Sequence, residues 1–340
     1  MSAGNKSDPV FAILALPEGT PLALHGLYEV FHCVGRTWAE LTGEENTPFT
    51  INPIIVARSL DPIETTIGIE VKPQATLGPA DVIIVADVAI SNEFDPRGCW
   101  SEEIAWIKER YQKGAIVCSV CSGSLLLAEA GLLNGEVATT HWAANDMFRT
   151  YYPDVRLAPE RILTTAGDSD RIVTGGGASS WEDLALYLVA RFSSSEEAIR
   201  IAKIFLFGER SEGQLLYAAA RRAKRHNDIV ISDAQAWIAE NYNDDKPVAK
   251  LVSKSGLRER TFNRRFRSAT GYTPIEYVQT MRIEEAKHLL EMSDTPIETI
   301  SNEVGYTDST YFRRLFRRRT GVTPARYRQR FSVISKIVKR

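Results

Sequence analysis

The chain repeats one short phrase near its C-terminal end, and this repeat constrains the fold more than any other feature. Residues 262–266 read FNRRF and lead into TGYTP; fifty residues later, residues 312–316 read FRRLF and lead into TGVTP. A short apolar segment and a turn containing Gly256 or Gly305 precede each copy. Two short helices joined by such a turn form a helix-turn-helix, whose second helix can enter a DNA major groove.

The second helix of each copy carries side chains suited to DNA. Phe262 and Phe266 stand four residues apart and face one side of the first such helix, which leaves Arg260, Asn263 and Arg264 on its other faces. In a major groove, arginine pairs bidentately with guanine and asparagine with adenine, while further arginines suit phosphates. A single arginine-rich helix is often only a solvated surface. Two matching copies at a fixed spacing favour DNA binding over that alternative.

The 19 residues between the copies, Pro274 to Met292, predict one continuous helix. Proline suits the first turn, and apolar residues recur with the 3.6-residue period of a helix that packs on one side. At about 1.5 Å per residue this helix is roughly 28 Å long. Successive major-groove faces of B-DNA lie about 34 Å apart, so one chain can present both second helices to one side of a duplex.

From about residue 230 to residue 331 the chain resembles the AraC/XylS family of transcription regulators. Both repeats, the joining helix and the closing GVTPARYR segment at 321–328 carry the resemblance. Ser301 departs from it, because the family more often has a small apolar residue there; its hydroxyl can bond to a backbone carbonyl. The resemblance implies a sequence-specific DNA-binding regulator, here expected to be an activator, with a double-stranded operator and RNA polymerase as partners. The positions that it implies for DNA contact are Arg260, Asn263, Arg264 and Arg267 in the first copy and Ser309, Thr310, Arg313 and Arg314 in the second.

Charge divides the chain at a similar place. The 340 residues carry 41 Lys and Arg against 43 Asp and Glu, a balance that says nothing about nucleic acid. From Asp228 onward there are 21 basic and 14 acidic residues, a net charge of +7, and the preceding part has a net charge of −9. Such asymmetry is typical of a DNA-binding domain joined to a domain with another role.

The remaining composition excludes several classes of protein. Residues 1–9 are polar and lack an apolar signal region, and no run approaches the ~18 apolar residues of a membrane span. Four cysteines in a chain this long form no disulfide scaffold, which predicts a cytoplasmic setting. Cys118 and Cys121 make one C-x-x-C without a second pair, so neither a metal nor a cofactor is expected.

The N-terminal part predicts a parallel sheet covered by helices on both faces. Continuous apolar runs, typical of buried parallel strands, alternate with segments of helical period. With 44% hydrophobic residues the chain can bury two cores. The expected strands are Val10–Leu16, Phe49–Ala57, Val82–Ala86 and Ala115–Cys118, and the expected helices are Leu22–Leu41, Ser101–Lys113, Ser122–Ala130, Trp181–Phe192 and Glu196–Leu206.

A candidate site follows the fourth of these strands, since ligands bind such sheets outside the carboxyl ends of the strands. A sharp turn there would lift Cys121 out of the sheet, and the adjacent helix N-terminus would favour a thiolate or a bound anion. His141, twenty residues later, offers an imidazole, and cysteine with histidine is the minimum for nucleophilic catalysis. Spacing alone favours the plainer alternative, a small buried cysteine and a hydrogen-bonded core histidine.

Residues 8–195 resemble the class I glutamine amidotransferase-like domain of the PfpI type. The elbow at Cys121, AGLLNG at 130–135, TTHW at 139–142 and TGGGAS at 174–179 carry the resemblance. It implies a flavodoxin-like α/β fold and makes Cys121 and His141 the inherited site positions. Two departures weigh against catalysis. Ser122 follows the cysteine where the peptidase-like branch often has histidine, and alignment through YEVF at 28–31 puts Ala23 where the family often has an acid.

Without that acid, the N-terminal domain suits ligand binding better than turnover. The whole chain is similar to AraC-family regulators that carry an amidotransferase-like sensor, and we expect a small-molecule effector to bias its DNA binding. We also expect the N-terminal domains of two copies to pair as a homodimer, because symmetric or repeated operators need two reading units. The alternative is a catalytically active cysteine hydrolase or hydratase joined to a DNA-binding domain.

The expected effector pocket lies at the strand ends beside Cys121. Trp142 and Trp181 can form part of an aromatic cage for a cationic amine, and core packing is the plainer alternative for either ring. The expected ligand-binding residues are Cys121, Ser122, His141, Trp142, Gly176 and Trp181. The expected domains are 1–210 for sensing and dimerisation, 211–230 as a linker, and 231–340 as an all-helical DNA-binding domain with two helix-turn-helix motifs.

Overall fold

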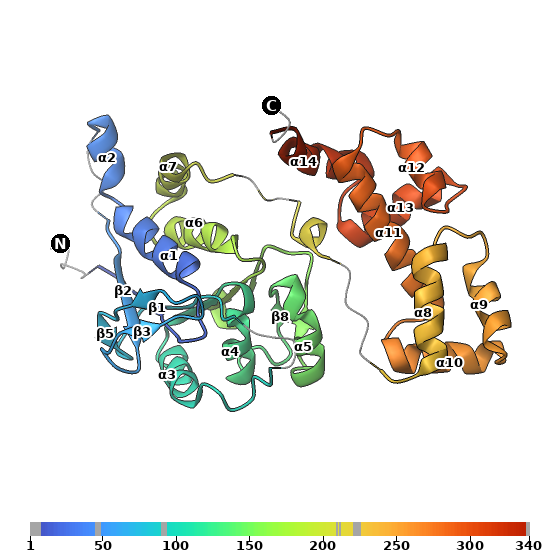
Figure 1. Cartoon of the computed structure of the whole chain (residues 1–340). Helices are drawn as coiled ribbons and strands as arrows, with labels where there is room; N and C mark the ends of the chain where they lie inside the picture. The colour runs from blue at the N-terminus through green and yellow to red at the C-terminus, as the bar shows by residue number, and fades with distance from the viewer. Residues whose placement is uncertain are drawn as a thin grey trace. The chain divides into compact units, whose positions relative to one another are not determined.

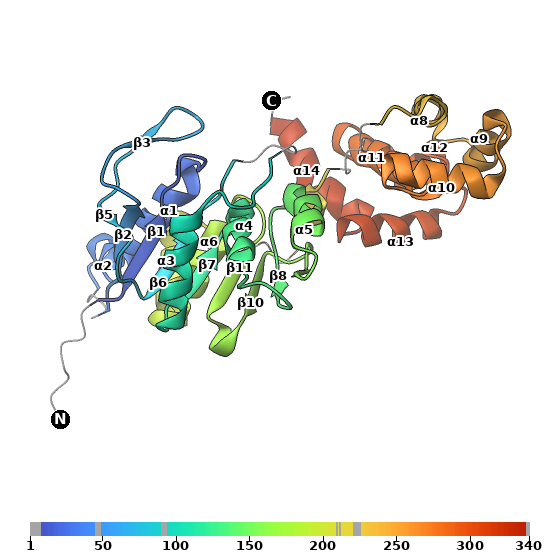
Figure 2. The same cartoon turned by 90° about the horizontal axis from the view of Figure 1, so that it is seen from below.

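The computed structural model describes residues 8–44, 49–89, 94–208, 210, 212–219 and 226–337, with side chains to residue 332. The chain divides into two compact units, Met1–Gln214 and Leu215–Arg340, which Figures 1 and 2 show from two directions. The division falls inside the segment expected to be a linker, 211–230. Residues 220–225 of that segment lie outside the described part.

A seven-stranded sheet forms the centre of the first unit, in the order β10-β11-β7-β6-β1-β2-β5. Its strand pairs are parallel except that β10 runs antiparallel to β11. The expected parallel sheet is therefore present, and its four expected strands are β1, β2, β6 and β7. β10 and β11 were not expected, because threonines interrupt their short apolar runs. The strands of this sheet are β1 (Val10–Leu14), β2 (Asn52–Ala57), β5 (Ala75–Thr76), β6 (Val82–Val85), β7 (Ile116–Ser119), β10 (Leu163–Ala166) and β11 (Ile172–Gly175). Two small sheets have two strands each: β3 (Ile63–Glu64) pairs with β4 (Glu70–Val71), and β8 (Val137–Ala138) pairs with β9 (Arg156–Leu157).

Helices cover both faces of the sheet (Figure 1). Successive side chains of a strand point to opposite faces, so Phe11 and Ile13 of β1 join the core under α1 and α6, while Ala12 and Leu14 join the core under α3 and α4. This is the arrangement of a flavodoxin-like α/β domain. The helices of this unit are α1 (Pro21–Cys33), α2 (Thr37–Thr42), α3 (Ser101–Gln112), α4 (Ser124–Glu129), α5 (Asn145–Tyr151), α6 (Ser180–Phe192) and α7 (Ser195–Phe205).

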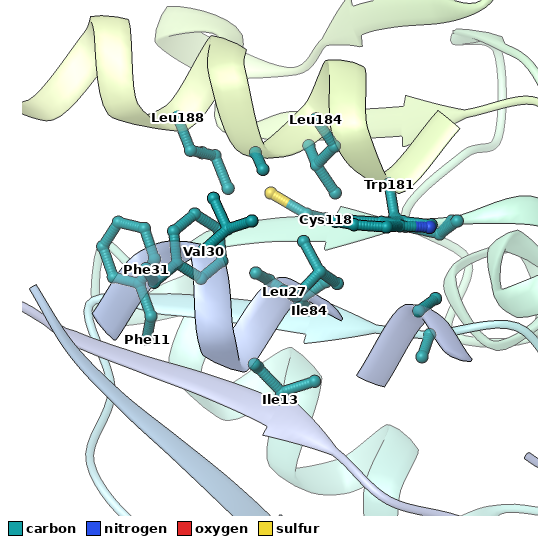
Figure 3. Packing of buried hydrophobic residues seen from close by; sticks show 14 of the residues in the cluster. Phe11, Ile13, Leu27, Val30, Phe31, Ile84, Cys118, Trp181, Leu184 and Leu188 are labelled. Carbon is teal, nitrogen blue, oxygen red and sulfur yellow. The ribbon is translucent and has the colours of Figure 1, made fainter. Parts of the chain in front are cut away.

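Aromatic and aliphatic side chains fill the first of these cores (Figure 3). Phe11 and Phe31 meet edge to face, with ring centroids 4.9 Å apart. Cys118 of the C-x-x-C pair lies in this core, where the α6 side chains Leu184 and Leu188 also pack. Burial raises the pKa of the Cys118 thiol well above its usual range. Cys118 is therefore a packing residue, and among the described residues no cluster of His, Cys, Asp and Glu could hold a metal ion.

The segment expected to be one helix, Leu22 to Leu41, is two helices. Gly35 has φ +71°, a conformation that glycine adopts without steric cost, and the chain changes direction there between α1 and α2. The backbone N–H of Gly35 donates to Oε1 of Glu197, 2.8 Å away on α7. The periodic apolar pattern continues across this break, so the periodicity concealed it.

Two small cores build the second unit around the joining helix α11. Val278, near the start of α11, packs with Phe262 and Phe266, whereas Leu290, near its end, packs with Phe312 and Phe316. The joining helix runs from Pro274 to Met292, the range expected, and Thr273 with Glu276 caps its start reciprocally. The helices are α8 (Ile229–Asn241), α9 (Pro247–Ser255), α10 (Glu259–Thr270), α11 (Pro274–Met292), α12 (Ile297–Glu303), α13 (Ser309–Thr320) and α14 (Pro324–Ile337). Among the described residues, every helix is too short or too polar to span a bilayer.

Candidate functional site

Each sequence repeat folds into two helices around a tight turn, as expected: α9 with α10, and α12 with α13. Gly256 ends α9 with φ +67°, and Gly305 follows α12 with φ +88°. A β-carbon on Gly305 would lie 2.6 Å from the carbonyl oxygen of Asn243, so only glycine fits this turn. The Ser301 hydroxyl donates to the carbonyl oxygen of Tyr306 at 3.1 Å, which confirms the bond to a carbonyl expected for this departure from the family.

The second helix of the first motif, the reading helix α10, has apolar side chains on one side and basic side chains on the other. Phe262 and Phe266 are fully buried, whereas Arg260, Arg264 and Arg267 are exposed. Asn263 is half-buried, and its Oδ1 atom is buried without a hydrogen-bond partner. Bidentate pairing of asparagine with adenine uses both the oxygen and the nitrogen of the amide, so adenine recognition by Asn263 requires its side chain to turn outward.

The second reading helix, α13, begins with a side-chain cap. Asp308 accepts hydrogen bonds from the backbone N–H groups of Thr310 and Tyr311 at 2.8 and 3.1 Å. Ser309 is half-buried, while Thr310, Arg313 and Arg314 are exposed. Arg313 forms an ion pair with Glu298 of α12. Exposed ion pairs contribute only about 0–1 kcal/mol, so this pair holds the Arg313 side chain only weakly.

Arg282 of α11 joins the loop that precedes the first helix-turn-helix to the turn of the second, a role that sequence reasoning missed. Nε donates to the carbonyl of Tyr242 at 2.6 Å and Nη2 to the carbonyl of Asp244 at 2.6 Å, both between α8 and α9. Nη1 donates to the carbonyl of Gly305 at 2.9 Å, in the turn before α13, and the guanidinium lies 4.8 Å from the Tyr306 ring centroid. One buried side chain therefore ties the α8–α9 loop to the turn before α13. The sequence signal that could have indicated this role is an arginine next to Ile283, within the apolar stripe of the helix.

In the first unit, Cys121 forms the expected sharp turn after β7. Its φ is +55°, which is strained for a residue with a side chain. The thiol is nevertheless buried, and burial together with the charge of Asp87 raises its pKa to about 11. The thiolate expected beside the helix N-terminus is therefore not favoured. The turn runs through three residues of 3-10 helix into α4, but burial of the thiol outweighs the backbone N–H of Ser122, which lowers the pKa.

Asp87 is a site residue that sequence reasoning missed. It follows β6, the strand next to β7, and its carboxylate accepts a hydrogen bond from the Thr20 hydroxyl at 2.5 Å. Burial raises the pKa of Asp87, and its charge acts on both Cys121 and His141. An acidic residue directly after the strand run 82–86, at the sheet edge where ligands bind, was the signal. Ala23 is fully buried in the same apolar cluster as Cys121.

The six expected ligand-binding residues do not all present free groups. The Ser122 hydroxyl donates to the carbonyl of Val88 at 2.5 Å and accepts from the N–H of the same residue at 3.1 Å. Ser122 therefore fastens the elbow to the loop after β6. His141 is half-buried, and Nδ1 accepts from the N–H of Ala143 at 3.2 Å. Burial lowers the pKa of His141, which favours the neutral imidazole at pH 7.

The two tryptophans lie in different surroundings. Trp142 is half-buried beside His141, with ring centroids 5.0 Å apart. Trp181 is only 9% exposed, and its ring packs edge to face on Phe207 with centroids 5.5 Å apart. A β-carbon on Gly26 would lie 2.8 Å from the same ring. The plainer alternative, core packing, therefore describes Trp181. Gly176 lies against the side chain of Gln214.

A narrow pocket opens beside Asp87 and Thr20, between the end of β1 and the start of α1. The volume of this pocket is about 10 Å³, which is enough for a single water molecule. None of the six expected ligand residues lines it. The residues around it are Leu14, Ala15, Leu16, Gly19, Thr20, Leu24, Thr65, Val71, Ala86 and Asp87.

Comparison with known proteins finds two families in the chain. Residues 251–330 match a helix-turn-helix domain, and residues 49–191 match the DJ-1/PfpI family. The chain is 29% identical over 231 residues to the HTH-type transcriptional regulator CdhR of Pseudomonas aeruginosa, a match that spans 66% of each protein. It is 23% identical to the regulator GbdR of the same species over 77% of this chain and 70% of GbdR. The chain is also 31% identical to isonitrile hydratase of Pseudomonas putida, in a match that covers 39% of this chain and 56% of the hydratase.

Proposed function

The chain belongs to the AraC-type regulators that carry an N-terminal DJ-1/PfpI domain, and we propose that it binds a DNA operator through α10 and α13. A small metabolite held by the N-terminal unit sets its affinity for that operator. The observation that carries this function is the repeated motif, in which two basic helices with exposed arginines, Arg264 and Arg314 among them, stand on one folded unit.

DNA selected from a random duplex library by the full-length protein supplies an operator for the test. Fluorescence anisotropy then gives the dissociation constant with amino acids, amines and quaternary ammonium compounds added in turn. An effector that prefers one conformation should change the constant about 5- to 150-fold. Selection that yields no preferred sequence would overturn the DNA-binding part, and an operator affinity indifferent to every compound class would overturn the sensing part.

Sensing is favoured over turnover by the state of Cys121. Two observations favour an enzyme: Asp87 places a carboxylate near the thiol, and part of the chain is similar to isonitrile hydratase. A thiol whose pKa is raised to about 11, however, carries little of the nucleophilic thiolate at neutral pH. Turnover that disappears in Cys121→Ala would support the enzyme. Effector-dependent operator affinity that survives this substitution supports the sensor.

The proposal extends to the assembly and its setting. Two copies pair through their N-terminal units, the pair activates transcription with RNA polymerase, and the protein works in the cytoplasm, where its operator lies. Ala23, at the position where related enzymes have an acid, keeps the unit non-catalytic. Sedimentation of the full chain at about tens of micromolar tests the pairing, since assembly depends on protomer concentration; a strict monomer there would contradict it.

A further inference from the structure

The end of the first unit folds back onto the strand ends like a bound peptide. After α7, Phe207 packs on Trp181, and Arg210 forms ion pairs with Glu182 and Asp183 at the start of α6. Gln214 then places its side chain in the sheet edge, where it is 2% exposed. We call residues 207–214 the tail; residues 209 and 211 lie outside the described part.

The amide of Gln214 sits in a cradle made only of hydrogen-bond acceptors. Nε2 donates to Oγ1 of Thr139 at 3.1 Å, to the carbonyl of Thr140 at 2.9 Å and to the carbonyl of Arg161 at 3.3 Å. The Thr139 hydroxyl itself donates to the Arg161 carbonyl at 2.8 Å, so it can only accept from Gln214. We call these three oxygens the acceptor cradle. It is shaped for an N–H donor.

Two glycines allow the amide to reach the acceptor cradle. A β-carbon on Gly213, whose φ is +74°, would lie 2.1 Å from the carbonyl oxygen of Glu160. A β-carbon on Gly176 would lie 2.4 Å from Nε2 of Gln214. Side chains at these positions would keep the tail away, so the close approach is built into the sequence. Gly176 is also one of the residues that the sequence assigns to the effector pocket.

The fit of Gln214 to the acceptor cradle is incomplete. Its Oε1 atom is buried without a hydrogen-bond partner, and an unsatisfied buried acceptor costs about 1–3 kcal/mol. An ammonium group would satisfy the same three oxygens and bring no orphaned acceptor. The cradle also adjoins the elbow, because the Thr140 hydroxyl donates to the carbonyl of Cys121 at 3.2 Å.

We propose that the acceptor cradle is an effector subsite for an N–H donor, an ammonium or primary amide group, and that Gln214 is its tethered competitor. This inference rests on the proposed sensing function. Two residues beyond Gln214, Leu216 is buried in the core of the second unit with Phe312 and Phe316 of the second helix-turn-helix. An effector that displaces Gln214 thus lengthens the free chain that joins the sensor to the DNA-binding unit.

Gln214→Ala in the full-length protein tests this directly, because acetamide is the fragment that the substitution removes. Hydrogen–deuterium exchange is followed in peptides covering 138–143 and 207–214. We expect faster exchange in both peptides of the variant, and acetamide or methylammonium should restore protection at 138–143. Half-saturation should need about tenfold less probe in the variant than in wild type, since a tethered group competes at millimolar effective concentration. Acetate at equal ionic strength should have no effect.

Gly176→Ala should release the tail and exclude acetamide, while Gly208→Ala, which has open space around it, should behave as wild type. Unchanged exchange in Gln214→Ala, or equal protection by acetate, would overturn the subsite. The two proposals fail separately. Probes that bind the cradle while no compound alters operator affinity leave the subsite standing without regulation. An effector equally potent on wild type and Gln214→Ala leaves regulation standing without the subsite.

Discussion

A β-carbon on Gly123 would lie 2.2 Å from the carbonyl oxygen of Ala86 and 2.6 Å from that of Val85. The turn that carries Cys121 is thus pressed against the end of β6, the strand that leads to Asp87. The hydrogen bonds between Ser122 and Val88 fasten the same two segments. Glycine at position 123 is what lets the elbow and the acid approach each other.

Gly123→Ala should therefore destabilise the N-terminal unit. The new methyl group meets backbone rather than a flexible side chain, so we expect a loss of about 1–3 kcal/mol in the free energy of unfolding. Gly208→Ala is the matched control, because its β-carbon meets nothing within 4 Å. Urea unfolding of both variants measures the difference. Equal stabilities would show that the elbow is not held against β6.

The reactivity of Cys121 should follow its raised pKa. With a pKa of about 11, only about 10⁻⁴ of the thiol is ionised at pH 7, and alkylation by iodoacetamide should be slow and rise with pH up to that value. Asp87→Asn removes a negative charge that disfavours the thiolate, so it should lower the pKa and speed alkylation at any fixed pH below it. Mass spectrometry of the Cys121 peptide gives the rates. A rate constant already level at pH 7 would contradict the buried thiol.

The sequence predicts much of this molecule because its strongest signals are local. The repeated phrase around Phe262 and Phe312 locates both reading helices, and the apolar stripe from Pro274 to Met292 gives α11 at its full length. Continuous apolar runs give the central strands. Each of these patterns records which face of one element is buried, and burial leaves a period that can be read directly.

What the sequence conceals are contacts between elements distant along the chain. Asp87 becomes a site residue only when β6 and β7 pair, and Arg282 only when α11 packs against two turns. Gln214 lies in an irregular segment without a period. The break at Gly35 is hidden because apolar residues recur at helical spacing on both sides of it, although no residue of α2 is buried. Depth of burial, which raises the pKa of Cys121, is likewise a property of the assembled layers.

Exposed arginines of the reading helices should carry the DNA affinity. Arg264→Ala and Arg314→Ala should each cost about 1–3 kcal/mol in operator binding, and a base-reading arginine should also relax the preference at one operator position. Arg265→Ala is the matched control on α10. Its guanidinium pairs with Asp228, with Nε 2.5 Å from Oδ2, so its loss should affect folding of α8 more than sequence preference. Anisotropy titrations with operator variants measure these effects; operator affinity unchanged in both alanine variants would refute the assignment.

Arg282 should set the spacing between the two DNA contacts. Lysine at this position keeps the charge, but a single ammonium group cannot reach the carbonyls of Tyr242, Asp244 and Gly305 as the planar guanidinium does. We expect Arg282→Lys to lower stability by about 1–3 kcal/mol through unsatisfied buried carbonyls, and to loosen one helix-turn-helix relative to the other.

The sharper readout of Arg282 is operator spacing. A rigid pair of reading helices tolerates one half-site spacing, so inserting one base pair between the half-sites should weaken wild type far more than Arg282→Lys. Arg328→Lys serves as the control. Arg328 lies on α14, and its guanidinium donates to the carbonyl of Thr295 at 2.5 Å, a contact that does not bridge the two motifs. Its spacing penalty should match wild type. If Arg282→Lys and wild type suffer the same penalty, helix α11 alone fixes the two motifs and the arginine contributes only to stability.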